Sequence, residues 1–315
     1  MTTPVNLEIL VGNLVEKCNM DPPCPYCSYH NHTGNDGGVD PQQWLEGITK
    51  IAQSVQPSFF EFGGYGEIFR NPIMVQAAAN ISGHNWVRMI SNLLAPAEAY
   101  MLLRGKHVML QVSFHPHFWG LDEAGVERFC DKLNLIQYEA GIYVSSVTIV
   151  GYPPFLPRIG DVPRRIAEVC NVSCIVHHCD TVYGDRKYPA AYTPEDLAMM
   201  EQATVRVTTA GTKYDHPLGL AGLYAQPSPY SNYRGSVKGM ACWAGTKYVM
   251  IHKDGNIYPC HHNMKQVMGH ITDGEIRPLD VPTRCSVDEC GCAGYYHRYL
   301  VSDPDNAASR SFGVI

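Results

Sequence analysis

The feature that most constrains the fold is a regular alternation of short apolar strands with helical segments over the first two-thirds of the chain. Strand-like stretches cover residues 7–14, 58–65, 87–94, 107–116, 144–154 and 173–180. Segments with helical spacing lie between them at residues 41–55, 71–82, 95–105, 125–141 and 161–171. Alternation at about thirty residues per unit predicts βαβ connections and a parallel sheet. Six units fit before residue 205, so we expect an α/β fold built on a partial (β/α)6 barrel of the TIM type.

The remainder of the chain has a different character. Residues 206–238 are rich in Gly, Pro, Ser and Tyr, which is typical of a connecting region. Beyond them, two cysteines bracket a hairpin signal, in which residues 247–252 and 257–260 flank a turn at Lys253–Asn256. We therefore expect a barrel over residues 1–205, a connecting region over 206–238 and a small cysteine-rich C-terminal domain over 239–315.

Composition and charge exclude some classes of protein. Of 315 residues, 45% are hydrophobic and 17% are charged, which suits a globular protein with a buried core. The net charge is -6, so acidic residues outnumber basic ones and no nucleic-acid partner is indicated. The sequence has no apolar run of membrane-spanning length and no signal-peptide pattern at its start, so we expect a cytoplasmic protein without a membrane partner. In that reducing compartment, twelve cysteines favour metal or redox chemistry over disulfides.

Three of these cysteines, Cys18, Cys24 and Cys27, follow the first predicted strand as a C-x5-C-x2-C array. A zinc site would use Cys24 and Cys27 as a pair, with Cys18 and either His30 or His32 to complete it. A disulfide knot is a second interpretation. A four-iron cluster held by three thiolates is the third, and it leaves one iron open to bind a substrate or cofactor. A loop at the C-terminal end of a barrel strand suits that purpose, because barrel active sites lie there.

The array resembles the cluster-binding loop of the radical S-adenosylmethionine (radical SAM) enzymes, which usually has the spacing C-x3-C-x2-C with an aromatic residue before the last cysteine. Tyr26 matches this pattern, whereas the five-residue first gap departs from it. The stretch GGYGEIFRNP at residues 63–72 resembles the glycine-rich GGEP motif of the same family. Glycines permit the close backbone approach that such a motif needs. The alternative is a tight strand-to-helix turn with a solvent-facing Glu67.

The resemblance implies a set of ligand contacts at the barrel mouth. Contacts to SAM are expected from Tyr26, Gly63, Gly64, Gly66, Glu67, Ser91, Asn92 and Ser113. Substrate contacts are expected, from fold position alone, at His115, His117, His178 and Tyr183. For Ser91, Asn92, Ser113 and His115, packing at the top of the barrel is an equal alternative. Four other cysteines are expected to be buried structural residues, namely Cys130, Cys170, Cys174 and Cys179.

The C-terminal part resembles the auxiliary-cluster domains called SPASM and twitch. Cys242-x12-Gly255-x4-Cys260 matches their C-x(9–15)-G-x4-C opening. Three further cysteines follow, Cys285, Cys290 and Cys292. Because five thiols cannot fully ligate two clusters, the resemblance implies one auxiliary [4Fe-4S] cluster, with Cys242 and Cys260 as its firmer ligands.

The resemblance implies a radical SAM enzyme. A reduced [4Fe-4S] cluster would cleave SAM to a 5'-deoxyadenosyl radical, which takes a hydrogen atom from the substrate, and the auxiliary cluster would aid oxidation or substrate binding. Its partners would be a small molecule or short peptide as substrate and an external one-electron donor of the flavodoxin or ferredoxin type. One alternative is a peptide maturase that forms thioether or carbon–carbon crosslinks. The non-enzyme alternative is a zinc-stabilised binding module.

Overall fold

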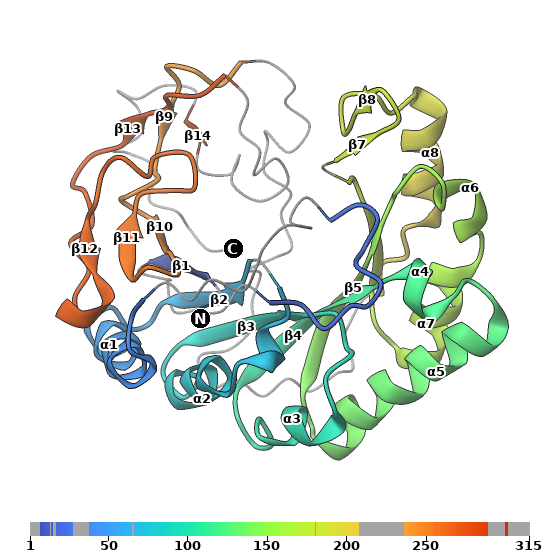
Figure 1. The fold of residues 1–315 in the computed structure, drawn as a ribbon, viewed down its shortest axis with the longest axis horizontal. Coiled ribbons are helices and arrows are strands. Elements are labelled where there is room, and N and C mark those ends of the chain that lie inside the picture. Colours follow the sequence, from blue (N-terminus) through green and yellow to red (C-terminus); the bar gives the residue numbers. More distant parts are fainter. Residues whose placement is uncertain are drawn as a thin grey trace.

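The computed structural model describes residues 7–12, 14, 17–27, 38–64, 66–179, 181–207, 236–288 and 300–301. Its centre is a curved parallel sheet with helices along its outer side (Figure 1). The six parallel strands are β1 (Glu8–Gly12), β2 (Phe59–Gly63), β3 (Trp86–Ser91), β4 (Val108–Phe114), β5 (Tyr143–Val150) and β6 (Cys174–His177). They pair in chain order, which confirms the predicted α/β fold with a partial barrel.

The helices of the barrel connect these strands in the predicted order. They are α1 (Pro41–Ser54), η1 (Ile68–Arg70), α2 (Pro72–Ile81), α3 (Ala97–Met101), α4 (Pro116–Trp119), α5 (Glu123–Asn134), η2 (Leu135–Glu139), α6 (Leu156–Ile159), α7 (Val162–Cys170) and α8 (Pro194–Ala203). Several begin at a proline preceded by a capping side chain, since proline needs no amide partner in the first turn. For example, Asp40 accepts hydrogen bonds from the amides of Gln42 and Gln43, both at 3.0 Å, at the start of α1.

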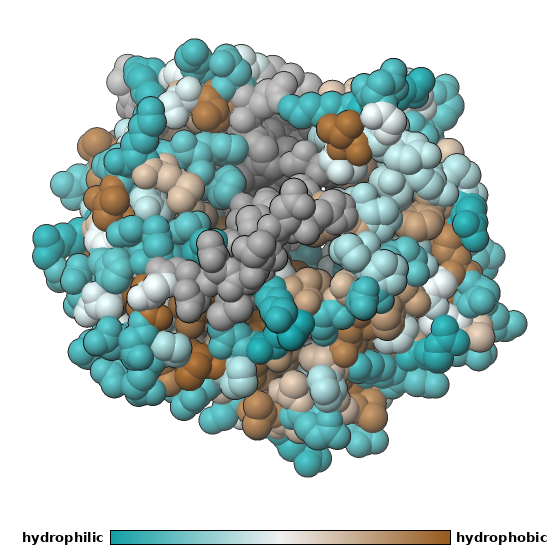
Figure 2. Space-filling model, viewed as in Figure 1, coloured by the Kyte–Doolittle hydropathy of each residue, from teal (hydrophilic) through white to brown (hydrophobic). Residues whose placement is uncertain are grey.

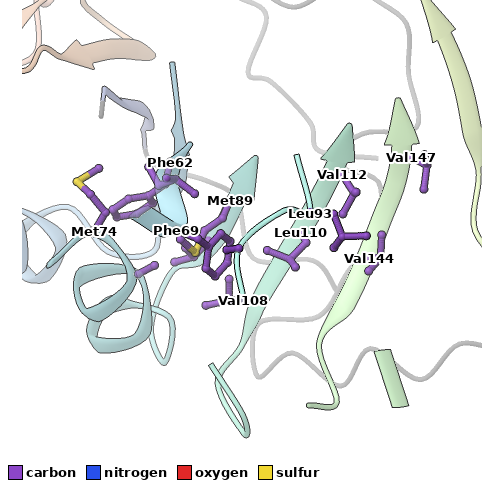
Figure 3. Packing of buried hydrophobic residues seen from close by; sticks show 14 of the residues in the cluster. Phe62, Phe69, Met74, Met89, Leu93, Val108, Leu110, Val112, Val144 and Val147 are labelled. Atoms are coloured by element: carbon purple, nitrogen blue, oxygen red, sulfur yellow. The ribbon is translucent and has the colours of Figure 1, made fainter. Parts of the chain in front are cut away.

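The main hydrophobic core lies between the sheet and the outer helices. Alternate strand residues such as Phe62, Met89 and Leu110 point to this side and are completely buried (Figure 3). Burying each such side chain contributes roughly 1.5–3 kcal/mol. The four cysteines expected to be structural, Cys130, Cys170, Cys174 and Cys179, are all buried in this core.

The opposite face of the strands lines the barrel interior. Phe59, Trp86 and Met109 form a separate small apolar cluster there. Two residues further along β2 and β3, the buried carboxylate of Glu61 forms an ion pair with the guanidinium of Arg88. The barrel interior is therefore apolar at one level and charged at the next.

The C-terminal part of the chain joins the same sheet. Strand β10 (Tyr248–Ile251) pairs in parallel with β1, and β11 (Asn256–Tyr258) and β12 (Gly269–His270) extend the sheet to nine strands. Antiparallel pairing of β10 with β11 confirms the predicted hairpin. The division of the chain at residue 239 stays a prediction, and this hairpin is continuous with the barrel sheet.

Smaller elements lie beyond the barrel sheet (Figure 1). Strand β9 (Ala241–Cys242) pairs with β13 (Thr283–Arg284) and β14 (Leu300–Val301), and β7 (Val182–Tyr183) forms a hairpin with β8 (Arg186–Lys187). The short helix η3 (Ile271–Asp273) packs on α1. Among the described helices, none combines the length and hydrophobicity that a membrane crossing requires. On the described part of the face in Figure 2, hydrophobic side chains are scattered among hydrophilic ones.

Candidate functional site

The cysteine loop lies at the C-terminal edge of the sheet, directly after β1. Cys24 is buried, Cys27 is half-buried, Cys18 is exposed, and all three thiols are free. The amide of Cys27 donates to the carbonyl of Cys24 at 3.0 Å, which closes a tight turn between them. His30 and His32, the other residues of the zinc interpretation, lie outside the described residues.

The three thiols are close enough to influence one another electrostatically. Burial, followed by the charges of Cys27 and Cys18, raises the pKa of Cys24 to about 12. The pKa of Cys18 is also raised, first by burial and then by Glu67 and Cys27. Thiols that repel one another as thiolates are stabilised when a metal centre supplies the compensating positive charge. The donor set therefore fits an iron–sulfur cluster with three cysteine ligands.

The glycine-rich loop after β2 packs directly against this cysteine loop. Gly66 has a left-handed backbone (φ +84), and a Cβ added to it would lie 2.5 Å from the carbonyl oxygen of Lys17. The amide of Glu67 donates to the same carbonyl at 2.9 Å. The guanidinium of Arg70 donates to the carbonyl of Cys18 at 2.8 Å. Glycine was expected in this stretch because it permits close approach of the backbone. In the structure, that close approach occurs between the glycine-rich loop and the cysteine loop.

Glu67 is buried, so the interpretation of this stretch as a turn with a solvent-facing Glu67 is wrong. Its carboxylate accepts hydrogen bonds from the hydroxyl of Ser91 at 2.9 Å and the amide of Asn92 at 2.8 Å. The amide of Phe69 donates to it at 3.2 Å. These bonds tie the end of β3 to the glycine loop. Burial raises the pKa of Glu67 to about 7, against these hydrogen bonds, which lower it.

This pKa predicts a measurable pH dependence of stability. A carboxyl group whose pKa rises from 4.5 to about 7 on folding binds protons more tightly in the folded state, so stability falls as the pH rises across this range. Relative to Glu67→Gln, the wild-type protein should lose about 3 kcal/mol of unfolding free energy between these pH values. Urea unfolding of both proteins at several pH values measures the difference. If the unfolding free energies of the two proteins changed with pH in parallel, the raised pKa of Glu67 would be contradicted.

The end of β3 carries a strained residue that sequence analysis missed. Leu93 has φ 64, a left-handed conformation that is costly for a residue with a branched side chain. Its amide donates to the hydroxyl of Ser91 at 3.1 Å, which helps to hold it there. The side-chain nitrogen of the neighbouring Asn92 donates a hydrogen bond to Oδ1 of Asn19 at 2.7 Å. The same nitrogen lies 3.6 Å from the sulfur of Cys18. No pattern in the sequence signals the strain at Leu93.

Aromatic side chains cover the other side of the cysteine loop. The hydroxyl of Tyr26 lies 2.8 Å from Nδ1 of His115, and the two rings are stacked. The ring of Tyr26 also contacts Tyr152, with 5.2 Å between ring centroids, and Phe155 at 6.5 Å. Burial, together with the neighbouring His117, lowers the pKa of His115 to about 3. Tyr152 and Phe155 were missed by sequence analysis, although both follow β5 at the predicted barrel mouth.

The other predicted substrate and SAM residues are spread around the strand ends. Tyr183 on β7 is 45% exposed and contacts Tyr152 at 5.3 Å, so it is linked to Tyr26 through one intervening ring. His178 follows β6 and packs against Tyr192. Ser113 is half-buried near the end of β4. Gly63 ends β2, and Gly64 has a left-handed backbone beside it. The SAM and substrate contacts assigned to all of these residues stay predictions.

The cysteines of the C-terminal part partly converge. Cys242 on β9 and Cys260 after β11 are half-buried and pack against the same small apolar cluster. Cys285 follows β13, which pairs with β9. Cys290 and Cys292 lie outside the described residues. The two cysteines expected to be the firmer ligands therefore border the same apolar cluster, and their assignment as cluster ligands stays a prediction.

Comparison with known proteins gives a likeness in fold. No family model and no curated protein matches the chain. The structure of anSMEcpe with bound AdoMet and Cp18Cys peptide matches 85% of this chain and 78% of its own, with TM-score 0.52 and 16% identity. SuiB of Streptococcus suis bound to S-adenosylmethionine matches 85% of this chain with TM-score 0.57 and 15% identity. The match covers only 64% of SuiB, which has also been solved with its precursor peptide SuiA (TM-score 0.55, 15% identity, 86% of this chain). On these grounds the chain has the fold of the radical SAM enzymes.

Proposed function

We propose that this protein is a radical SAM enzyme that modifies a short peptide or a small molecule. The observation that carries the proposal is the placement of Cys18, Cys24 and Cys27 on one loop after β1, against which the glycine loop packs through Gly66 and Glu67. Three thiolates at the C-terminal edge of a parallel sheet suit a cluster with one open iron. When bound, the cluster and SAM supply a 5'-deoxyadenosyl radical as the hydrogen-abstracting group.

The residues of this chain supply binding and orientation. Cys18, Cys24 and Cys27 would hold the cluster, and the backbone of Gly63, Gly64 and Gly66 would face SAM. Glu67 acts by holding the amide of Asn92 and the hydroxyl of Ser91 in place, so its carboxylate is already occupied. Tyr26, Asn92 and Ser113 are the remaining proposed SAM contacts. Protein dipoles that are fixed before reaction need no reorganisation during it.

On the substrate side, the aromatic side chains of Tyr26, Tyr152 and Tyr183 form a connected row from the cysteine loop to the β7–β8 hairpin. Such rings exclude water and contact apolar groups. We infer contacts to substrate from Tyr183, His178, His115 and His117. A short peptide is favoured because anSMEcpe and SuiB have both been solved with peptides. A reductant of the flavodoxin or ferredoxin type, and a location in the cytoplasm, complete the proposal.

The proposal is tested by loading the purified protein with iron and sulfide in the absence of oxygen. We expect a brown protein with broad absorbance near about 400 nm and about eight irons per chain, since two four-iron clusters are proposed. Addition of SAM and a strong reductant should release 5'-deoxyadenosine. A protein that takes up no iron and cleaves no SAM under these conditions would instead support the zinc-stabilised binding module.

An auxiliary [4Fe-4S] cluster is the second part of the proposal, with Cys242 and Cys260 as ligands together with Cys290 and either Cys285 or Cys292. Cys260→Ala should lower the iron content by about four per chain, since one cluster is lost. Reductive SAM cleavage should continue, because the cysteine loop after β1 is untouched, whereas modified substrate should no longer form. Iron analysis and mass spectrometry of the products measure both effects. Unchanged iron and full turnover would remove the auxiliary cluster from the proposal.

A further inference from the structure

We propose that Cys24, His115 and His117 form a binding site for a single divalent transition-metal ion, such as Zn2+, which competes with the iron–sulfur cluster for Cys24. This inference goes beyond the proposed function, because it concerns the protein before a cluster is loaded. It also differs from the zinc interpretation of the sequence, in which Cys18 and Cys27 were ligands. Here the two other ligands come from the end of β4 and the start of α4.

The distances between the ligand atoms support this site. The sulfur of Cys24 lies 3.5 Å from Nδ1 of His115, and one ligand atom from each of the three residues lies within 4.8 Å of the others. Zinc binds sulfur at about 2.3 Å and imidazole nitrogen at about 2.0–2.1 Å in tetrahedral geometry, which separates the two ligand atoms by about 3.6 Å. Cys24 and His115 therefore already stand at the separation that a shared metal ion requires.

His117 supplies an independent observation. Both of its ring nitrogens are buried and make no hydrogen bond of normal geometry within the described residues, and the backbone of Pro22 is a polar neighbour of the ring. A buried polar group that is poorly paired costs free energy, which a metal–nitrogen bond would recover. The ring of His117 stands at 80° to that of His115, with 5.9 Å between centroids. Perpendicular imidazoles two residues apart can approach one ion from different directions.

The state of the imidazoles also suits metal binding. Burial lowers the pKa values of His115 and His117, and in the case of His117 the backbone of Pro22 opposes this in part. A lowered pKa favours the neutral imidazole, which is the form that binds metals. In the metal-free protein, Nδ1 of His115 is close to the hydroxyl of Tyr26, at 2.8 Å. A metal ion on Nδ1 replaces this hydrogen bond, and the fourth position stays open to water.

The consequence is competition for one thiolate. Cys24 cannot bind the mononuclear ion and an iron of the cluster at once in the arrangement proposed here. Protein isolated without its cluster should then carry a single divalent ion, and that ion should leave before the cluster can be assembled. Zinc added before iron and sulfide should slow cluster loading of the wild-type protein.

The test is titration of the iron-free full-length Cys260→Ala protein with Co2+, which needs neither SAM nor cluster. This background disables the ligand set proposed for the auxiliary cluster, whose thiolates would also bind Co2+. We expect one Co2+ per chain, with the visible bands of tetrahedral Co2+ and a near-ultraviolet thiolate charge-transfer band. His117→Gln should weaken Co2+ binding at least about tenfold, as expected for loss of a ligand. Cys24→Ala should remove the charge-transfer band, whereas Cys18→Ala and Cys27→Ala should keep it. His84→Gln, at an exposed position, is the matched control and should bind as the background protein does.

Two outcomes would overturn the proposal. One is equal Co2+ affinity of His117→Gln and His84→Gln. The other is loss of the charge-transfer band in Cys18→Ala or Cys27→Ala as large as in Cys24→Ala, which would point to a site made of the three cysteines. X-ray absorption of the Cys260→Ala protein loaded with one zinc ion per chain leaves all three proposed ligands in place, and we expect one sulfur and two imidazole nitrogens around the ion. Because SAM cleavage is not measured here, failure of this site and failure of the radical SAM function are distinguishable.

Discussion

Cys24→Ala is expected to reduce 5'-deoxyadenosine formation on the order of a thousandfold or more, as is typical when one member of a unit that acts together is removed. Cys24 is buried at the centre of the three-thiol loop, and the charges of both other cysteines act on it. With two thiolates left, the proposed cluster would lack its third cysteine ligand, and the chain would no longer hold it in place for reaction with SAM. Anaerobic assay of the reconstituted variant with SAM and reductant measures the loss.

The matched control for this variant is Cys130→Ala. Cys130 is also a buried, free cysteine, but it lies on α5 within the helix-side core. Loss of its sulfur should cost little more than the burial of one small apolar group, about 1 kcal/mol, and should leave SAM cleavage intact. If the two variants behave alike, the assignment of the cluster loop fails.

Gly66→Ala is expected to destabilise the protein by about 3 kcal/mol and to lower cluster content with it. A left-handed backbone costs alanine roughly 1–2 kcal/mol, and the new Cβ would stand 2.5 Å from the carbonyl oxygen of Lys17. Forcing an atom into such a packed contact adds about 1–3 kcal/mol. Because Lys17 precedes Cys18, relief of the clash moves the cysteine loop. Urea unfolding of the iron-free protein and iron content after reconstitution measure the two effects.

Gly83→Ala is the control for this substitution. No heavy atom lies within 4 Å of the Cβ position at Gly83, and its backbone is not left-handed. The change should therefore alter stability by less than about 0.5 kcal/mol. Equal stabilities of the Gly66 and Gly83 variants would mean that the glycine loop and the cysteine loop are not packed together as described.

Local properties of the sequence account for most of the fold. The six strand–helix units were predicted from periodicity, because alternation of strands and helices follows from which side chains each segment must bury. Helix starts such as Asp40-Pro41 follow from capping chemistry within a few residues. The place of the cysteine loop followed from the same reasoning, since a loop after the first strand of a parallel barrel lies at its C-terminal edge.

Contacts between distant segments needed the tertiary structure. Pairing of β10 with β1 brings residues about 240 positions apart into register, and nothing local specifies that partner. The burial of Glu67 depends on the end of β3, and its charge state follows from that burial. The approach of His115 to Cys24 spans 91 positions along the chain. Thus the sequence by itself determined the secondary structure, its order and the cysteine motifs. The tertiary structure decided which polar groups contact one another. Those contacts depend on how the sheet curves and on which surface each loop packs against.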